Sequence, residues 1–121
     1  MTRAHGFAGD VEAAMRAATE AVQTARAAGD VWVTALAQIA LGAGLTHAQR
    51  AKDALNPLGD ALATFRACGD SFGRAAARLW LARAYWELDQ SERMLAHLDE
   101  ALALAQEQQY DYLIKIGRAH V

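Results

Sequence analysis

The sequence predicts an all-α protein, built as an array of antiparallel helix pairs. Three observations predict this class: a composition that favours helices, a helical spacing of apolar residues, and an internal repeat. Alanine, the best helix former, supplies 30 of the 121 residues, whereas proline, the worst, occurs once. Because β-branched residues are few, the composition argues against a β-rich fold.

The repeat is visible without gaps along the chain. Residues 21–30 (AVQTARAAGD) match residues 61–70 (ALATFRACGD) at six of ten positions, and at 101–110, the same offset further on, the apolar pattern alone survives. The register predicts a half repeat, two full repeats and the start of another: 10–29, 30–69, 70–109 and from 110. It also aligns an aromatic column, which we interpret as core between repeats: Trp32, Phe72 and Tyr112.

Within each unit, apolar residues recur at steps of three and four, which places them on one face of an α-helix. We expect helices at about residues 10–28, 31–44, 47–68, 71–88 and 90–108, and another from about 111. Each unit therefore holds a pair of helices.

The start and stop signals agree with these bounds. Gly29-Asp30 and Gly69-Asp70 each combine a glycine suited to a helix C-terminus with an aspartate that caps the next helix. Capping boxes are expected at Asp89–Glu92 and, in a weaker form, at Thr46–Gln49.

Pro57 is the exception to the helical pattern. It predicts either a kink in the third helix or a restart with Asn56 as the N-cap. The kink is favoured, because Leu55 and Leu58 keep the apolar stripe continuous.

The helix pairs resemble the tetratricopeptide repeat. The first helix of that repeat carries Leu-Gly or Leu-Ala, followed three residues later by a bulky residue. Here Leu41-Gly42 precedes Leu45, and Leu81-Ala82 precedes Tyr85. The second helix carries small and bulky residues, which here are Ala54, Leu58 and Ala61, then Met94, Leu98 and Ala101.

The resemblance covers residues 10–112 and departs from the family in three ways. The repeat unit, as in 30–69, is longer than that of the family, the proline after the second helix is replaced by Gly-Asp, and the first-helix tryptophan is replaced by Gln38 and Arg78. The resemblance implies a right-handed superhelical α-solenoid over residues 1–114.

Repeats of this length resemble the helical arrays of large bacterial transcriptional regulators, which sense an inducer or a partner protein. The resemblance implies a protein-protein interaction or regulatory scaffold module, as a fragment of such a sensor array. Two alternatives stay open: a stand-alone adaptor that binds a peptide in a concave groove, and an accessory module of an enzyme.

By the same resemblance, the first helices of successive pairs line the concave face. The candidate partner-binding residues on that face are Ile39, Thr46, Leu79, Arg83 and Trp86. Arg83 and Trp86 stand out, because arginine and tryptophan are enriched in interface hot spots. The structural alternative is that Trp86 packs against the next helix pair and that Arg83 pairs with Glu87.

Other functions have little support in the residues. A net charge of −2 argues against direct nucleic-acid binding, and the polar and glycine residues within 31–48 argue against a membrane span. We expect no catalytic residue, cofactor or metal site, since the histidines lack ligand spacing and His97 is interpreted as a surface residue. The lone Cys68 excludes an internal disulfide and fits a cytoplasmic location.

The two ends carry separate expectations. Residues 115–121 abandon the pattern, and IGRAHV resembles a translated sequencing adapter, so this segment is predicted to be a non-native tail or a frayed terminus. At the other end, the first helix is the second member of a pair. We therefore expect its Met15 and Val22 side to be exposed, with self-association through the terminal helices.

Overall fold

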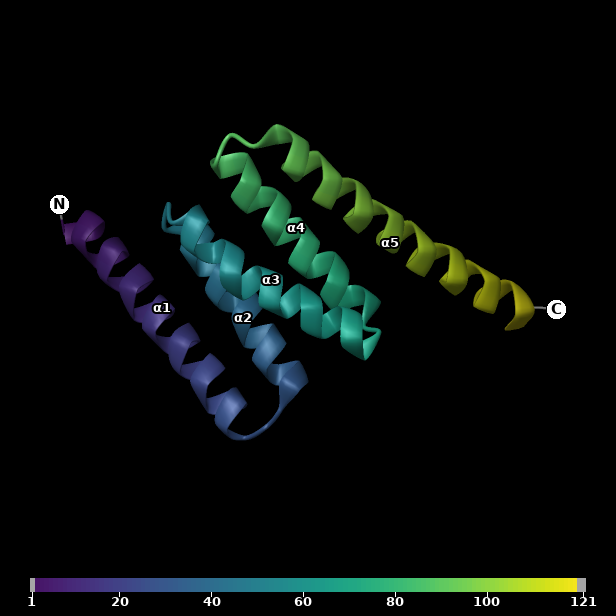
Figure 1. The fold of residues 1–121 in the computed structure, drawn as a ribbon, viewed down its shortest axis with the longest axis horizontal. Helices are drawn as coiled ribbons and strands as arrows, with labels where there is room; N and C mark the ends of the chain where they lie inside the picture. The colour runs from purple at the N-terminus through teal and green to yellow at the C-terminus, as the bar shows by residue number, and fades with distance from the viewer. Residues whose placement is uncertain (1, 120–121) are drawn as a thin grey trace.

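The protein is described by a computed structural model over residues 2–119, of which residues 2–9, 110, 113, 114 and 119 are described by their backbone alone. The described residues form helices and no strand: α1 (Thr2–Ala27), α2 (Val31–His47), α3 (Ala51–Cys68), α4 (Ser71–Glu87) and α5 (Ser91–Ala119). Successive helices run antiparallel and pack against each other, and α4 also contacts α2 (Figure 1). The all-α prediction is confirmed.

The turns between helices recur at even intervals along the chain. A residue in the left-handed region stands in each of them: Gly29, Gln49, Gly69 and Asp89. In each turn the next amide N–H donates back to the carbonyl five residues earlier, as Asp70 N does to Phe65 O at 2.9 Å. The sequence predicted the two glycine turns and a break between helices at residue 89, but not the left-handed conformation of Gln49 and Asp89, whose φ values are 63° and 58°.

The aspartate caps are confirmed. Asp30 Oδ1 accepts the N–H of Val33 at 3.0 Å, and Asp70 Oδ1 accepts the N–H of Gly73 at 2.9 Å. Each carboxylate satisfies a backbone donor that the first turn of a helix leaves unpaired.

Both predicted capping boxes are wrong. Asp89 forms the left-handed turn after α4, and α5 begins at Ser91. Thr46 lies inside α2, where its hydroxyl donates to the carbonyl of Gly42 at 2.8 Å. Arg50 precedes α3 and makes no side-chain cap. Asp89 and Gln49, which the two capping boxes would have used, instead adopt the left-handed conformation of the turns between helices.

Four helix bounds differ from expectation, and one of them is the end of α2, which lies at His47 and not at about residue 44. Helix α1 begins at Thr2, well before residue 10, and α3 begins at Ala51. Helix α5 continues through residue 109 to Ala119, so the helix expected from 111 is the end of α5. Its segment Gln106–Gln109 contains strong helix formers and no glycine, which favours continuation over a turn. Residues 115–119 are helical, and residues 120–121 lie outside the described part.

Pro57 lies inside α3, well beyond its first turn. The helix is therefore already formed before the proline, which excludes a restart with Asn56 as its N-cap. A proline at this depth removes one backbone donor from the helix.

The core lies between the helices and uses small residues where they approach closely. Leu58 and Phe65 of α3 are fully buried. A Cβ atom added to Gly42 would overlap Leu58, and one added to Gly73 would overlap Phe65. Glycine at these two sites lets α2 and α4 pack directly onto the large side chains of α3.

Two expectations about the core are wrong. The aromatic column is exposed, with Phe72 keeping 75% of its surface, because this position is the second residue of α2 and α4 and faces solvent. Met15 and Val22 of α1 are buried, and Met15 belongs to the main core cluster with Leu45. Helix α1 therefore directs its apolar stripe at α2.

Candidate functional site

Exposed large apolar side chains gather on three of the helices, α2, α4 and α5. Helices α2 and α4 carry Val31, Trp32, Val33, Leu36, Phe72, Leu79 and Trp86, and α5 carries Leu95, Leu102, Tyr112 and Ile116. Among the side chains that the structure describes, α1 and α3 contribute no exposed large apolar residue. Among the described side chains, the exposed large apolar residues are therefore confined to these three helices.

We call the outward side of α2 and α4 the first-helix face and define it by Trp32, Leu36, Phe72 and Arg83. Trp32 and Leu36 are one turn apart on α2, and Phe72 stands on α4, where Trp32 stands on α2. Because α2 and α4 are in contact, the two stripes lie on neighbouring helices.

Trp32 is held in place by the cap of α4. Its indole Nε1 donates to Asp70 Oδ2 at 2.8 Å, while the other carboxylate oxygen caps the helix. Hydrogen bonds from the Gly73 N–H and the Trp32 indole lower the pKa of Asp70, so the carboxylate stays ionised. One aspartate thus joins α2 to α4 and orients a half-exposed aromatic ring.

Three of the predicted partner-binding residues share one side of α4. Leu79, Arg83 and Trp86 follow one another at steps of four and three and are exposed. Arg83 Nε donates to Glu87 Oε1 at 3.0 Å, as the structural alternative expected. Trp86 keeps 59% of its surface, so within the described residues no following helix pair covers it.

The other two predicted residues are not available to a partner. Thr46 is 2% exposed, and Ile39 is partly buried against the core. They occupy the same repeat positions as Trp86 and Leu79, one repeat earlier in the chain. We infer that α4, which packs against α2, covers them.

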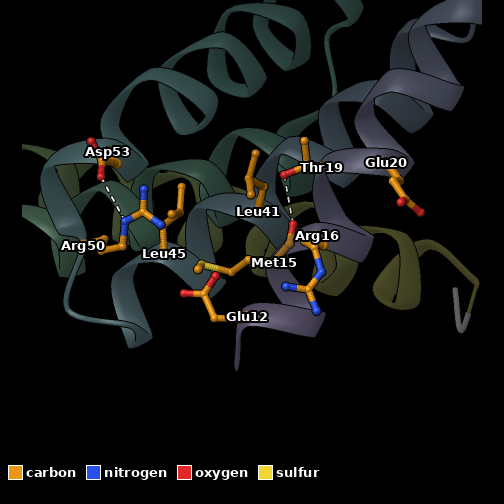
Figure 2. Close-up of a pocket in the computed structure, with 9 residues that line it drawn as sticks. All are labelled: Glu12, Met15, Arg16, Thr19, Glu20, Leu41, Leu45, Arg50 and Asp53. Atoms are coloured by element: carbon orange, nitrogen blue, oxygen red, sulfur yellow. Dashed lines mark hydrogen bonds and ion pairs between the residues drawn. The ribbon is translucent and has the colours of Figure 1, made fainter. Parts of the chain in front are cut away.

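A groove runs along α2 between α1 and α3 (Figure 2). Its largest hollow holds about 440 Å³ and has a floor of Met15, Leu41 and Leu45. The charged side chains on its walls are Glu12, Arg16, Glu20, Arg50 and Asp53. Two further hollows continue along α2 past Gln38, which is almost fully buried. The sequence did not indicate this groove, because its walls belong to α1 and α3, the second helices of their pairs, whereas the predicted binding face lies on the first helices.

Two polar side chains of the groove walls make hydrogen bonds within their own wall. Arg50 Nε donates to Asp53 Oδ2 at 3.1 Å, and the Thr19 hydroxyl donates to the Met15 carbonyl at 2.9 Å (Figure 2). Both signs of charge alternate along its walls, so the groove favours neither an anion nor a cation.

A polar cluster centred on Arg78 joins α4 to α5. The nearly buried guanidinium contacts His97 Nδ1 at 3.1 Å through Nη1 and pairs with Glu100 through Nη2. The Tyr85 ring stacks on His97 at a centroid distance of 5.5 Å, and Arg93 lies over the Tyr85 ring. The surface interpretation of His97 is therefore wrong.

The protonation state of His97 follows from this packing. Burial lowers its pKa most, the nearby Arg78 lowers it further, and Glu100 opposes them. A neutral imidazole accepts at Nδ1 from the guanidinium of Arg78. The cluster fixes α5 on α4 and shows no feature of catalysis. A His–Glu pair at i, i+3 on α5 was the signal in the sequence that could have indicated it.

The described part of the chain offers neither a metal-binding cluster nor a membrane-spanning helix. No three His, Cys, Asp or Glu side chains described there could hold a metal ion together. No described helix is long and apolar enough to cross a membrane. Cys68 is exposed near the end of α3.

Comparison with family models, with curated proteins and with solved structures finds no match for this chain. Its function is therefore argued from its own surfaces.

Proposed function

We propose that this chain is a protein-protein interaction module: a right-handed, superhelical array of tetratricopeptide-like helix pairs that acts as a regulatory scaffold. The observation that supports it most is the set of exposed large apolar side chains on α2, α4 and α5, seven of which lie on α2 and α4. Contiguous apolar surface on a soluble protein marks interaction sites more often than it is incidental. The proposal includes no catalytic role.

The first-helix face has the composition of an interface centre. Tryptophan, phenylalanine and arginine supply large contact areas and are enriched where binding energy concentrates. Trp32 is also held by Asp70 before any partner arrives, which lowers the entropy lost on binding. The partner proposed for this face is a peptide segment that buries apolar side chains against Trp32, Leu36 and Phe72.

The setting proposed for the module is the sensor array of a bacterial transcriptional regulator in the cytoplasm. A stand-alone adaptor would use the same face. An ATPase motif or a helix-turn-helix elsewhere in the intact gene supports the regulator, and a gene without either supports the adaptor.

Selection from a random peptide library tests the proposed binding face. The protein serves as bait, and the double variant Trp32→Ala, Phe72→Ser serves in a counter-selection that removes peptides bound elsewhere. We expect the surviving peptides to lose about 30-fold in affinity on Trp32→Ala, as a hot-spot tryptophan would give.

Glu12→Gln, on the far groove wall, is the matched control and is expected to leave the affinity unchanged. If no peptide distinguishes the protein from the double variant, the first-helix face is not the binding site and the proposal fails.

A further inference from the structure

The pair α4–α5 carries a surface that corresponds, one repeat later, to the one on which α4 itself is seated. We call it the end face: Leu79 and Trp86 of α4 with Leu95 and Leu102 of α5. The equivalent positions on α2 and α3 are Ile39, Thr46, Leu55 and Leu62. Leu62 is 8% exposed, whereas Leu102 is 52% exposed, and Thr46 and Trp86 differ in the same direction.

The chain itself shows what covers such a surface. Helix α4 packs on both α2 and α3. Its residues Ala77, Leu81 and Ala84 lie in one core cluster with Leu58 and Leu62 of α3, and Leu55 packs against that cluster. Ala77 and Ala84 are fully buried.

The seated face of α4 is made of small residues for a physical reason. The receiving side chains of α3 are large, so close packing at interior density needs glycine or alanine opposite them. Gly73 shows the limit, because a Cβ atom there would overlap Phe65. Leu81 is the one large α4 residue buried in the cluster, and Trp80, which packs against the cluster, meets His47 at the end of α2 with ring centroids 5.4 Å apart.

We propose that the end face is a docking site for a partner helix of the α4 type. Such a helix is amphipathic and carries small residues where α4 has Ala77 and Ala84, with a leucine where α4 has Leu81. The position of Gly73 places no demand on size, because Ala105 of α5 stands where Phe65 stands on α3. The end face supplies the large side chains and the partner supplies the small ones.

On α4 the end face adjoins the first-helix face, because Leu79 and Trp86 lie on the same side of the helix as Phe72 and Arg83. Leu95 and Leu102 of α5 belong to the end face alone, so the end face extends the module beyond the function proposed above.

A second copy of the chain fits the end face less well. The α4 of that copy is already seated on its own α2 and α3, and its exposed first-helix face would set large side chains against large ones. Its α1 exposes small residues, Ala14 and Ala21, yet buries its large apolar residues Met15 and Val22 inward. A partner helix with a leucine among small residues is the better complement.

A synthetic peptide of residues 70–90, which is α4 with its flanking turns, is the probe. The peptide carries a fluorescent label, and its anisotropy is followed while the full chain is added. We expect saturable binding, with affinity lowered at least about tenfold by Leu95→Glu with Leu102→Glu, since charge would be buried against apolar surface. These leucines are exposed, so circular dichroism of the double variant is expected to match the original.

Two controls separate the alternatives. Leu36→Glu, on the first-helix face, is expected to leave peptide binding unchanged, and Ala77→Glu in the peptide is expected to abolish it. The peptide could instead displace the chain's own α4 from α2 and α3, and its affinity would then not depend on Leu95 and Leu102. Binding that survives the substitution of these two leucines therefore overturns the proposal. Absence of binding at about 1 mM peptide also overturns it.

Sedimentation of the chain alone decides the case of a second copy. If the chain is dimeric and Leu95→Glu with Leu102→Glu makes it monomeric, the occupant is another copy and the partner helix is refuted. If the library selection yields no peptide that depends on Trp32 while the α4 peptide still binds, only the proposed first-helix binding face is refuted. The two proposals can therefore fail separately.

Discussion

Gly42→Ala perturbs the closest approach between α2 and α3, and two opposing terms set its effect. Replacing a helical glycine by alanine stabilises a helix by about 1 kcal/mol. Against this, the new Cβ would overlap Leu58 at its branch carbon as well as its methyl groups, and Leu58 is fully buried. Overpacking a core costs about 1–3 kcal/mol, and contact with a branch carbon belongs at the upper end of that range. We therefore expect a net loss of about 2 kcal/mol.

Gly59→Ala is the matched control. Gly59 lies in the middle of α3, and a Cβ atom there would meet nothing within 4 Å. Only the helix-propensity term acts, so the free energy of unfolding is expected to rise by about 1 kcal/mol. The two glycine-to-alanine variants should then differ by about 3 kcal/mol, or about 12 °C in Tm for a chain of this length.

Urea unfolding followed by far-ultraviolet circular dichroism measures both variants, with an unchanged m-value as the check that unfolding stays two-state. Adding Leu58→Ala to Gly42→Ala removes the overlapping atoms, so the double variant should be more stable than the sum of the single effects by about 2 kcal/mol. If Gly42→Ala is as stable as Gly59→Ala, the close approach of α2 and α3 is not as described, and the reasoning is refuted.

Three further predictions concern polar groups. Asp70→Ala is expected to cost about 1 kcal/mol of unfolding free energy through the lost cap, and to free the Trp32 indole, visible as a shift in its fluorescence. Glu100→Ala leaves the nearly buried Arg78 without its carboxylate partner and is expected to lower the free energy of unfolding by about 1–2 kcal/mol. The loss is smaller than for a fully buried pair because Glu100 is half-exposed. Asp99→Ala, at the neighbouring residue, is the control and should change the stability little. Because the pKa of His97 lies below 6.5, the unfolded state binds more protons between the two values, so the free energy of unfolding should fall as pH drops below about 6.5. A titration of stability against pH as steep in His97→Gln as in the original chain would contradict this assignment.

The helical class and the aspartate caps were predictable from the sequence because their causes are local. Asp30 and Asp70 accept N–H groups three residues away, and Gly29 and Gly69 adopt a conformation that glycine reaches without strain. These features depend on neighbours in the chain and on no distant contact. The left-handed conformations of Gln49 and Asp89 were not predictable, because no glycine marks these two turns and other residues adopt this conformation less readily.

The candidate surfaces were less predictable because exposure depends on which helix lies alongside. Thr46 and Trp86 share one repeat position, yet one is buried and the other open, since only the first has a packed helix beside it. Leu79, Arg83 and Trp86 were found by spacing alone. The Arg78 cluster was missed because its partners His97 and Glu100 stand on another helix, α5, beyond an intervening turn.

The pattern of helix contacts has a consequence for how the chain folds and opens. Each helix touches its neighbours in sequence, and α2 also touches α4, so no contact joins α1 to α5 in the described part of the chain. In a chain whose helices contact mainly their neighbours in sequence, folding can begin at any helix pair and extend to the next one. The terminal helices have neighbours on one side only, so we expect unfolding to begin there. Amide hydrogen exchange should therefore be slowest in α2, α3 and α4 and fastest in the outer parts of α1 and α5. The helices that carry the first-helix face are thus the last to open.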